Sequence, residues 1–382
     1  MFFEKLKCPV MHYAWGEKAS DKDGALIPKI LNVPAGDEPW AELWIGAHPQ
    51  ASSVVAKTGK PLYEAIAENP REMIGEKEGT LPFLLKILCC SNVLSIQSHP
   101  DRQTAKRLHR LMPENFPDEN HKPEMIYALS NFEMMAGFRD IDDILADLSQ
   151  FKSLAPWKKS LPSIPFLRDI CSALMQFDKA ALDKMATNFI AETSRRAGRF
   201  ALFRRLFKQY PGDSGVFFSL ILNYMTLKPC QAVYIGSNMP HAYIKGRGIE
   251  CMANSNNVIR AGLTPKYVNR DLLLNTLDFK SVSPKDLTMT PKDRFTNFNC
   301  GDFALCVLRL RGDDDSCMMP GGFPAVLVVV EGDVELKYKN KKVKAERGSA
   351  WFVPHSLNFM DCTISSKKPA VVAIAGIDIF HE

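Results

Sequence analysis

Short apolar segments rich in β-branched residues follow one another through the last part of the chain, and they constrain the fold more than any other feature. They are separated by turn residues such as glycine, aspartate and proline. The segments cover residues 304–310, 325–330, 334–338, 349–353 and 370–374. Several short strands at this spacing are typical of a sandwich or a barrel. We therefore predict that the C-terminal part of the chain is built from β-sheet.

A different pattern occupies the middle of the chain. Apolar residues recur there at a spacing of three to four, which indicates amphipathic helices. The helical segments begin at about residue 101 and continue in 140–148 and in 178–209, with an interruption near Gly198. Apolar runs that indicate strands lie at 41–45, 81–88 and 231–235. A mainly helical region is therefore expected between about 125 and 227, within an otherwise β-rich chain.

The composition excludes several classes of protein. The 382 residues suffice for two or three domains, and the net charge of +5 allows an anionic small molecule but is far from a nucleic-acid-binding surface. The longest apolar run, near 324–330, is too short to cross a bilayer, and the first ten residues lack the apolar core of a secretory signal. Ten cysteines occur without a CxxC pair. We expect a cytoplasmic protein with reduced thiols that binds neither nucleic acid nor membrane.

Four polar residues suggest a metal site. Side chains alternate along a strand, so Gln97 and His99 point to one face and can reach the same ion. Glu124 offers a carboxylate and His241 a second imidazole. Two nitrogens and two oxygens would leave room for water or substrate, as a catalytic ion requires. By spacing alone a polar patch without metal is the simpler interpretation, because these residues are far apart in the sequence.

Longer motifs favour the metal site. Three blocks closely resemble signature motifs of the type I mannose-6-phosphate isomerases: LPFLLKILCCSNVLSIQSHPDRQTA, NHKPEMIYALSNFEMMAGFR and HAYIKGRGIECMANSNNVIRAGLTPKYVN. Two further segments are similar to the same family: AELWIGAHPQ and YPGDSGVFFSLILNYMTLKPCQAVYI. The matches occur in order between about residues 13 and 269. Members of this family are zinc enzymes that interconvert mannose 6-phosphate and fructose 6-phosphate, so the resemblance implies one Zn²⁺ per chain and a sugar phosphate as substrate.

The resemblance also assigns roles to individual residues. It implies that the zinc ligands are Gln97, His99, Glu124 and His241. It implies that the catalytic residues are Arg260, Lys122, Glu250 and Tyr243. It implies that the sugar-phosphate cleft is lined by Ser95, Lys86, Lys266 and Trp15. The resemblance implies that a proton moves between C1 and C2 through a cis-enediol, and the sequence leaves the base open between Lys122, Glu250 and His121.

A weak internal repeat bears on the architecture. Residues 231–241 and 348–355 both run from a strand through a proline to a histidine, an element found in cupin barrels. We predict a mainly β fold of two cupin (jelly-roll) barrels with an α-helical insertion. The expected parts are a discontinuous catalytic cupin domain of residues 1–124 and 228–290, a helical domain of 125–227 and a C-terminal cupin domain of 291–382. His355 lacks a neighbouring Q-x-H pair, so no second metal site is expected, and we predict a monomer.

Three positions depart from the family pattern. Asn256 replaces a usual aspartate, which puts the rate in doubt because an amide cannot accept a proton. Arg247 stands in what we expect to be a turn after His241, where the family usually has aspartate. Cys230 stands at a usual glycine, which implies a backbone compatible with a side chain.

Two alternatives to an isomerase remain open. Asn256 is compatible with a non-catalytic cupin that binds a sugar phosphate or a metal and descends from such an isomerase. The other alternative is a different cupin metalloenzyme, such as an iron-dependent oxygenase. That interpretation would leave Arg260 and Lys266 unexplained.

Overall fold

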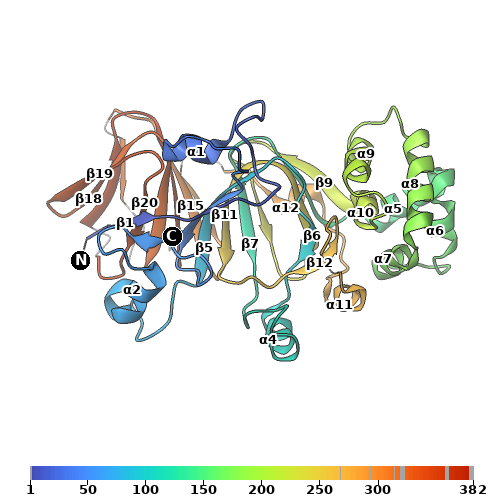
Figure 1. Ribbon diagram of the computed structural model, residues 1–382, viewed down its shortest axis with the longest axis horizontal. Helices are drawn as coiled ribbons and strands as arrows, with labels where there is room; N and C mark the ends of the chain where they lie inside the picture. The colour runs from blue at the N-terminus through green and yellow to red at the C-terminus, as the bar shows by residue number, and fades with distance from the viewer. Residues whose placement is uncertain are drawn as a thin grey trace.

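The computed structural model describes residues 2–266, 268–291, 295–313, 315–318, 323–357 and 361–377. Three parts follow one another along its longest axis (Figure 1). Two smaller sheets lie at one end, a large sheet occupies the middle, and a group of helices lies at the other end. The large sheet is called the central sheet below, and the two smaller ones the C-terminal sheets. No helix in the described ranges is long and apolar enough to span a bilayer.

The central sheet has eleven strands within the described residues. They are β2 (Val10–Met11), β3 (Glu42–Gly46), β5 (Phe83–Cys90), β6 (Ile96–Ser98), β7 (Glu124–Ala128), β8 (Phe132–Phe138), β9 (Leu222–Leu227), β10 (Ala232–Ile235), β11 (His241–Ala253), β12 (Ile259–Gly262) and β13 (Thr288–Met289). The main path runs β13-β10-β7-β11-β5-β3-β2. The first residues of β11 pair with β8 and β6, and its later residues pair with β5 and β7. This long strand therefore joins the segments that carry the four predicted zinc ligands.

All eight residues of β5 are buried, because the strand is covered on both faces. Leu85, Ile87 and Cys89 pack in a core shared with the C-terminal sheets, whereas Leu88 and Cys90 pack in the interior of the central sheet. The alternation of side chains along a strand puts Lys86 on the same face as Leu88. A lysine is thus directed into the interior by its place in an apolar strand.

The C-terminal sheets contain seven and four strands in the described ranges. The first consists of β1 (Glu4–Lys7), β4 (Val54–Val55), β14 (Phe295–Asn299), β15 (Ala304–Leu310), β17 (Ala325–Glu331), β20 (Ala350–Val353) and β22 (Ala370–Gly376). The second consists of β16 (Asp315–Met318), β18 (Val334–Tyr338), β19 (Lys341–Ala345) and β21 (Cys362–Ser366). The five C-terminal segments predicted from the sequence are all strands. The N-terminal strand β1 pairs with β20 and so joins the C-terminal part.

The helices at the far end come between β8 and β9. They are α5 (Ile141–Gln150), η1 (Lys152–Leu154), α6 (Ala155–Lys159), α7 (Leu167–Gln176), α8 (Lys179–Glu192), α9 (Arg199–Gln209) and α10 (Gly215–Ile221). The interruption predicted near Gly198 is real, since this residue is the N-cap of α9 with φ +64°. The range 125–227 also contains β7, β8 and β9, whose mostly buried residues belong to the central sheet.

Shorter helices connect the strands elsewhere. They are α1 (Leu26–Leu31), α2 (Leu62–Glu68), α3 (Pro70–Ile74), α4 (Arg102–Leu111), α11 (Arg270–Thr276) and α12 (Pro284–Leu287). Helix α4 matches the helical pattern expected from residue 101, and its N-cap Asp101 accepts a hydrogen bond from the Thr104 amide.

The structure corrects the expected backbone at two of the unusual positions. Arg247 lies within β11 rather than in a turn, and its guanidinium donates to Glu17 at 2.6 Å and to the carbonyl of Gly24 at 2.7 Å. Cys230 has φ +78°, so the expectation of an ordinary backbone there was wrong. The left-handed region is where glycine is favoured, because a Cβ is crowded by the following carbonyl.

Candidate metal centre and substrate site

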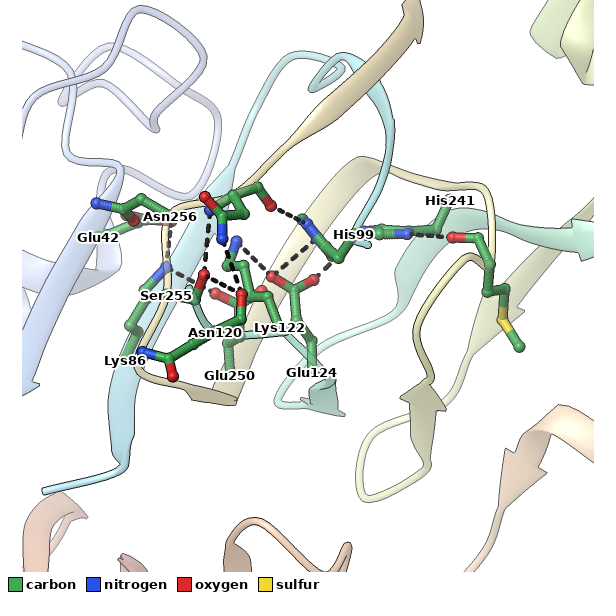
Figure 2. Close-up of polar contacts among 12 residues, drawn as sticks. Glu42, Lys86, His99, Asn120, Lys122, Glu124, His241, Glu250, Ser255 and Asn256 are labelled. Atoms are coloured by element: carbon green, nitrogen blue, oxygen red, sulfur yellow. Dashed lines mark hydrogen bonds and ion pairs between the residues drawn. The ribbon is translucent and has the colours of Figure 1, made fainter. Parts of the chain in front are cut away.

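Two histidines and a glutamate converge inside the central sheet. His99 follows β6, Glu124 opens β7 and His241 opens β11. One potential ligand atom from each lies within 4.8 Å of the others, and all three residues are buried. The Nε2 atoms of His99 and His241 are each 3.3 Å from a different oxygen of Glu124 (Figure 2). The three segments meet because β6 and β7 both pair with β11.

Main-chain carbonyls orient both imidazoles. Nδ1 of His99 donates to the carbonyl of Asn257 at 2.8 Å, and Nδ1 of His241 donates to the carbonyl of Met239 at 3.0 Å. With Nδ1 protonated, each neutral ring directs the Nε2 lone pair toward Glu124. Both Nε2 atoms and Oε2 of Glu124 are buried without a hydrogen-bond partner in the described part of the chain. Buried acceptor atoms that point at one another without a hydrogen-bond donor between them are suited to bind a cation.

The pKa values of His99 and Glu124 agree with a site that offers electron pairs to a metal ion. Burial lowers the pKa of His99 to about 4, although the Glu124 carboxylate acts in the opposite direction. Burial alone would raise the pKa of Glu124, but Lys122 and His99 outweigh it and hold that pKa well below its usual range. Lys122 lies 2.7 Å from Oε1 of Glu124. At neutral pH the site therefore presents the neutral imidazole of His99 and the carboxylate of Glu124 beside the ring of His241, a donor set that suits zinc.

Gln97 lies beside this group in the sheet. Its partner on one side is His241 in β11, and its partner on the other side is Arg260 in β12. Residues directly opposite one another in a sheet point to the same face, so the three side chains form a row. The sheet thus places the predicted fourth ligand next to His241 and puts Arg260 one strand farther on.

A buried network of charges adjoins the metal ligands. Lys86 lies 2.9 Å from Oε2 of Glu250 and 3.5 Å from Oε1 of Glu42. Trp44 donates its indole NH to the other oxygen of Glu42 at 2.7 Å, and the Lys86 ammonium lies over the Trp44 ring. Glu250, Lys86 and Trp44 are paired residues across β11, β5 and β3, so the sheet register brings them together.

Burial governs the protonation of this network. It raises the pKa of Glu250, although Lys86 opposes the shift. Burial would lower the pKa of Lys86, but Glu250 and Glu42 outweigh it and raise that pKa above its usual value. Burial also raises the pKa of Tyr243 well above its usual value, and the negative charge of Glu250 adds to the shift. A carboxyl with a raised pKa next to a fixed ammonium is a suitable proton carrier.

Arg260 is an unpaired cation at the edge of the site. Its side chain is partly buried, and no hydrogen bond or ion pair is made by its guanidinium among the described residues. Burial lowers the pKa of Arg260 from its ordinary value. An arginine kept partly out of water without a counter-charge is suited to bind an anion.

The other predicted cleft residues differ in exposure. Ser95 directly precedes β6 and is partly buried, whereas Lys266 follows β12 and is exposed. Trp15 is partly buried, packs against the core that contains Tyr243 and stacks on Tyr13. Their contacts with substrate stay predictions.

His121 contacts a different part of the chain from the other two base candidates, Lys122 and Glu250. Its Nε2 lies 2.7 Å from Oδ1 of Asp302, which belongs to the C-terminal part of the chain. Arg102 also donates to Asp302, at 3.0 Å. The imidazole is therefore held by the C-terminal part, whereas Lys122 and Glu250 lie among the metal ligands and their neighbours.

Asn256 is held by one main-chain and one side-chain hydrogen bond. Its main-chain NH donates to Asp118 at 3.0 Å, and its side-chain amide donates to the Gln50 carbonyl oxygen. Within the part of the chain that the structure describes, it makes no hydrogen bond with Arg260.

Comparison with known proteins identifies the family of the chain. A family model described as phosphomannose isomerase type I, catalytic domain, matches residues 3–141. The mannose-6-phosphate isomerase of Schizosaccharomyces pombe is 32% identical over an alignment that covers 98% of this chain and 100% of that protein. The chain belongs to the type I phosphomannose isomerase family. The Rattus norvegicus mannose-6-phosphate isomerase is 37% identical over 75% of each chain.

A solved structure from this family agrees over nearly the whole chain. The Salmonella typhimurium mannose 6-phosphate isomerase, crystallised with its substrate and zinc, superposes with a TM-score of 0.85. The two chains are 28% identical, and the match covers 98% of this chain and 99% of that one. The family resemblance inferred from the sequence motifs is thus confirmed.

Within this phosphomannose isomerase fold, sequence analysis overlooked two carboxylates. Glu42 is buried and bridges Lys86 and Trp44. Its signal was its position two residues before Trp44 on a strand, which puts both side chains on one face. Asp118 accepts hydrogen bonds from the segment before β12 and gave no signal beyond its place ahead of the predicted ligand Glu124.

Proposed function

We propose that this protein is a zinc-dependent mannose-6-phosphate isomerase. The observation that supports it best is the juxtaposition of the His99, Glu124 and His241 acceptors with Arg260, whose guanidinium has no partner among the described residues. A cation site and an anion site on one face of a sheet suit a substrate with adjacent oxygens at one end and a phosphate at the other.

The proposed reaction moves one proton between C2 and C1 of the open-chain sugar phosphate. His99, Glu124, His241 and Gln97 would hold the zinc ion, which would supply Lewis-acid stabilisation of the O1 and O2 oxygens. Arg260, Lys266 and Ser95 bind the phosphate end, and Trp15 lines the cleft.

Two groups near the zinc ligands are suited to carry the proton. Glu250 combines a raised pKa with an ion pair to Lys86, which keeps its carboxyl group in place. Lys122 is the other candidate, because its ammonium lies beside Glu124. Tyr243 would donate a hydrogen bond rather than transfer the proton, since its phenol stays protonated. Lys86, held between two carboxylates, would act mainly on Glu250. Its effect on the phosphate would be limited to the attraction of its positive charge.

We further propose the architecture of two cupin barrels with a helical insertion. The central sheet would form the catalytic barrel, and the C-terminal sheets the second. Helices α5 to α10, inserted between two neighbouring strands, support this division. The domain boundaries given above, the monomeric state and the cytoplasmic location stay predictions.

The test is isomerase activity measured together with zinc content. The purified protein should convert mannose 6-phosphate to fructose 6-phosphate in a coupled assay, with about one zinc per chain, and should lose activity on chelation. His99→Ala and His241→Ala should lose the metal, whereas His109→Ala on helix α4 is the matched control. Zinc binding without turnover would instead support the non-catalytic binding protein.

A further inference from the structure

The carboxylate of Asp118 accepts hydrogen bonds from the segment that precedes β12. It lies between α4 and β7, and the proposed reaction does not use it. Its Oδ1 accepts hydrogen bonds from the Ser255 hydroxyl at 2.8 Å, the Asn257 side-chain amide at 3.0 Å and the Asn120 main-chain NH at 2.9 Å. Its Oδ2 accepts one from the Asn256 main-chain NH at 3.0 Å. Both oxygens of the carboxylate are therefore occupied by donors from the protein itself.

The same two segments are joined by further bonds. The side-chain amide of Asn257 also donates to the carbonyls of Asp118 and Asn120, each at 2.8 Å. Ser255 and Asn257 are fully buried. Each of these hydrogen bonds takes the place of a hydrogen bond to water in the unfolded chain. A buried polar group left without a partner would cost free energy. Asn257 is therefore held in one position relative to Asp118 (Figure 2 shows the neighbouring residues Asn120, Ser255 and Asn256).

Asn257 also contacts the predicted metal ligand His99. Its main-chain carbonyl accepts the hydrogen bond from Nδ1 of His99. That bond sets both the tautomer of the ring and the direction of Nε2. Groups that orient metal-binding histidines in this way change metal affinity when they are removed.

We propose that Asp118 is a positioning residue for the metal site, acting through Asn257 on His99. The carboxylate fixes the carbonyl of Asn257, and the carbonyl holds the imidazole so that Nε2 faces Glu124. This inference rests on the metal site of the proposed function. It concerns how tightly zinc is held rather than how the sugar reacts.

The test is zinc affinity, measured by chelator competition on the full-length protein. Asp118→Ala should weaken zinc binding by about 10- to 100-fold, in the range seen when such orienting groups are removed. Asp118→Asn keeps an oxygen for three of the donors and should lose less than about tenfold, since one hydrogen bond is worth about 1 kcal/mol. Asp178→Ala is the matched control, because Asp178 caps helix α8 in the helical part through the Ala181 amide.

The outcomes separate this inference from the proposed function. If the wild-type protein binds no zinc, the proposed function fails. If it does bind zinc and Asp118→Ala binds it equally well, or is weakened no more than Asp178→Ala, the role of Asp118 is refuted. Should Asp118→Ala not fold, Asp118→Asn decides: a loss of about threefold or more supports the role, and an unchanged affinity overturns it.

Discussion

Asp302 accepts a hydrogen bond from His121 over 2.7 Å, although 181 positions separate the two residues in the chain. The contact joins the C-terminal part to the segment that leads into Lys122 and Glu124. Both side chains are partly exposed, 18% for His121 and 25% for Asp302. Solvent screening therefore limits what the contact contributes to stability.

We expect a coupling energy of about 0.5–1 kcal/mol between Asp302 and His121. Urea unfolding of Asp302→Asn, His121→Gln and the double variant measures it as a double-mutant cycle. The cycle is needed because Asp302 also accepts a bond from Arg102. A coupling indistinguishable from zero would mean that the contact does not hold the segment.

Removing the two predicted phosphate-binding cations should have different effects. Lys266→Ala should raise KM about tenfold with little change in kcat, because an exposed lysine contributes uniform binding. Arg260→Ala should raise KM and also lower kcat, since Arg260 is the strand partner of Gln97, which is in turn the strand partner of His241. Steady-state kinetics with mannose 6-phosphate measure both. Lys342→Ala on β19 is a surface control, and equal turnover of unphosphorylated mannose would refute phosphate recognition.

The stability of the metal-free protein should fall in acid partly because of His48. Burial lowers the pKa of His48 to about 4, with Lys86 adding to the shift. In the unfolded chain a histidine titrates near 6.5, so between about pH 6.5 and 4 the unfolded state binds more protons. The free energy of unfolding should therefore decrease as the pH falls through this window, with a contribution of up to about 1.4 kcal/mol per pH unit.

His48→Gln should flatten that dependence. The measurement is urea unfolding at several pH values between about 4 and 7 in the presence of a chelator, for the wild type and the variant. If the two proteins lose stability in parallel over this window, His48 is not buried in its neutral form.

Asn256→Asp tests the main departure from the family pattern. The side-chain amide contacts Gln50 rather than Arg260, so restoring a carboxylate should leave the phosphate site and KM nearly unchanged. If a proton acceptor is needed there, kcat should rise about tenfold, equivalent to about 1.4 kcal/mol of barrier. Asn256→Ala removes the Gln50 contact without adding a carboxylate and serves as the control. A level or lower kcat for Asn256→Asp, with zinc retained, would make the departure neutral.

Cys230→Gly should stabilise the fold by about 1 kcal/mol, because glycine relieves the left-handed backbone at φ +78°. Cys230→Ala removes the thiol but keeps the Cβ, so it should not stabilise. Thermal or urea unfolding of both variants distinguishes backbone strain from the loss of the thiol. A glycine variant no more stable than the alanine variant would mean that φ is not the cause.

The sequence by itself determined most of the local structure. Short apolar runs bounded by turn residues identified β5 and the C-terminal strands, and the three- to four-residue spacing identified helices α4, α5, α8 and α9. Motifs identified the family and the three residues that converge in the metal site. These features depend on short stretches of chain, where side-chain period and turn residues act directly.

Only the tertiary structure decided which distant segments become neighbours. Lys86 was expected from the motifs to line the sugar-phosphate cleft, but its ion pairs with Glu42 and Glu250, which come from strands on either side of β5, could not be read from the sequence. Strand β1 joins β20 at the other end of the chain, and hydrogen bonds of Asn257 connect Asp118 to His99. A strand pattern gives the face on which a side chain lies but not the partner strand. Partners are fixed when the sheets pack and bury their apolar faces together.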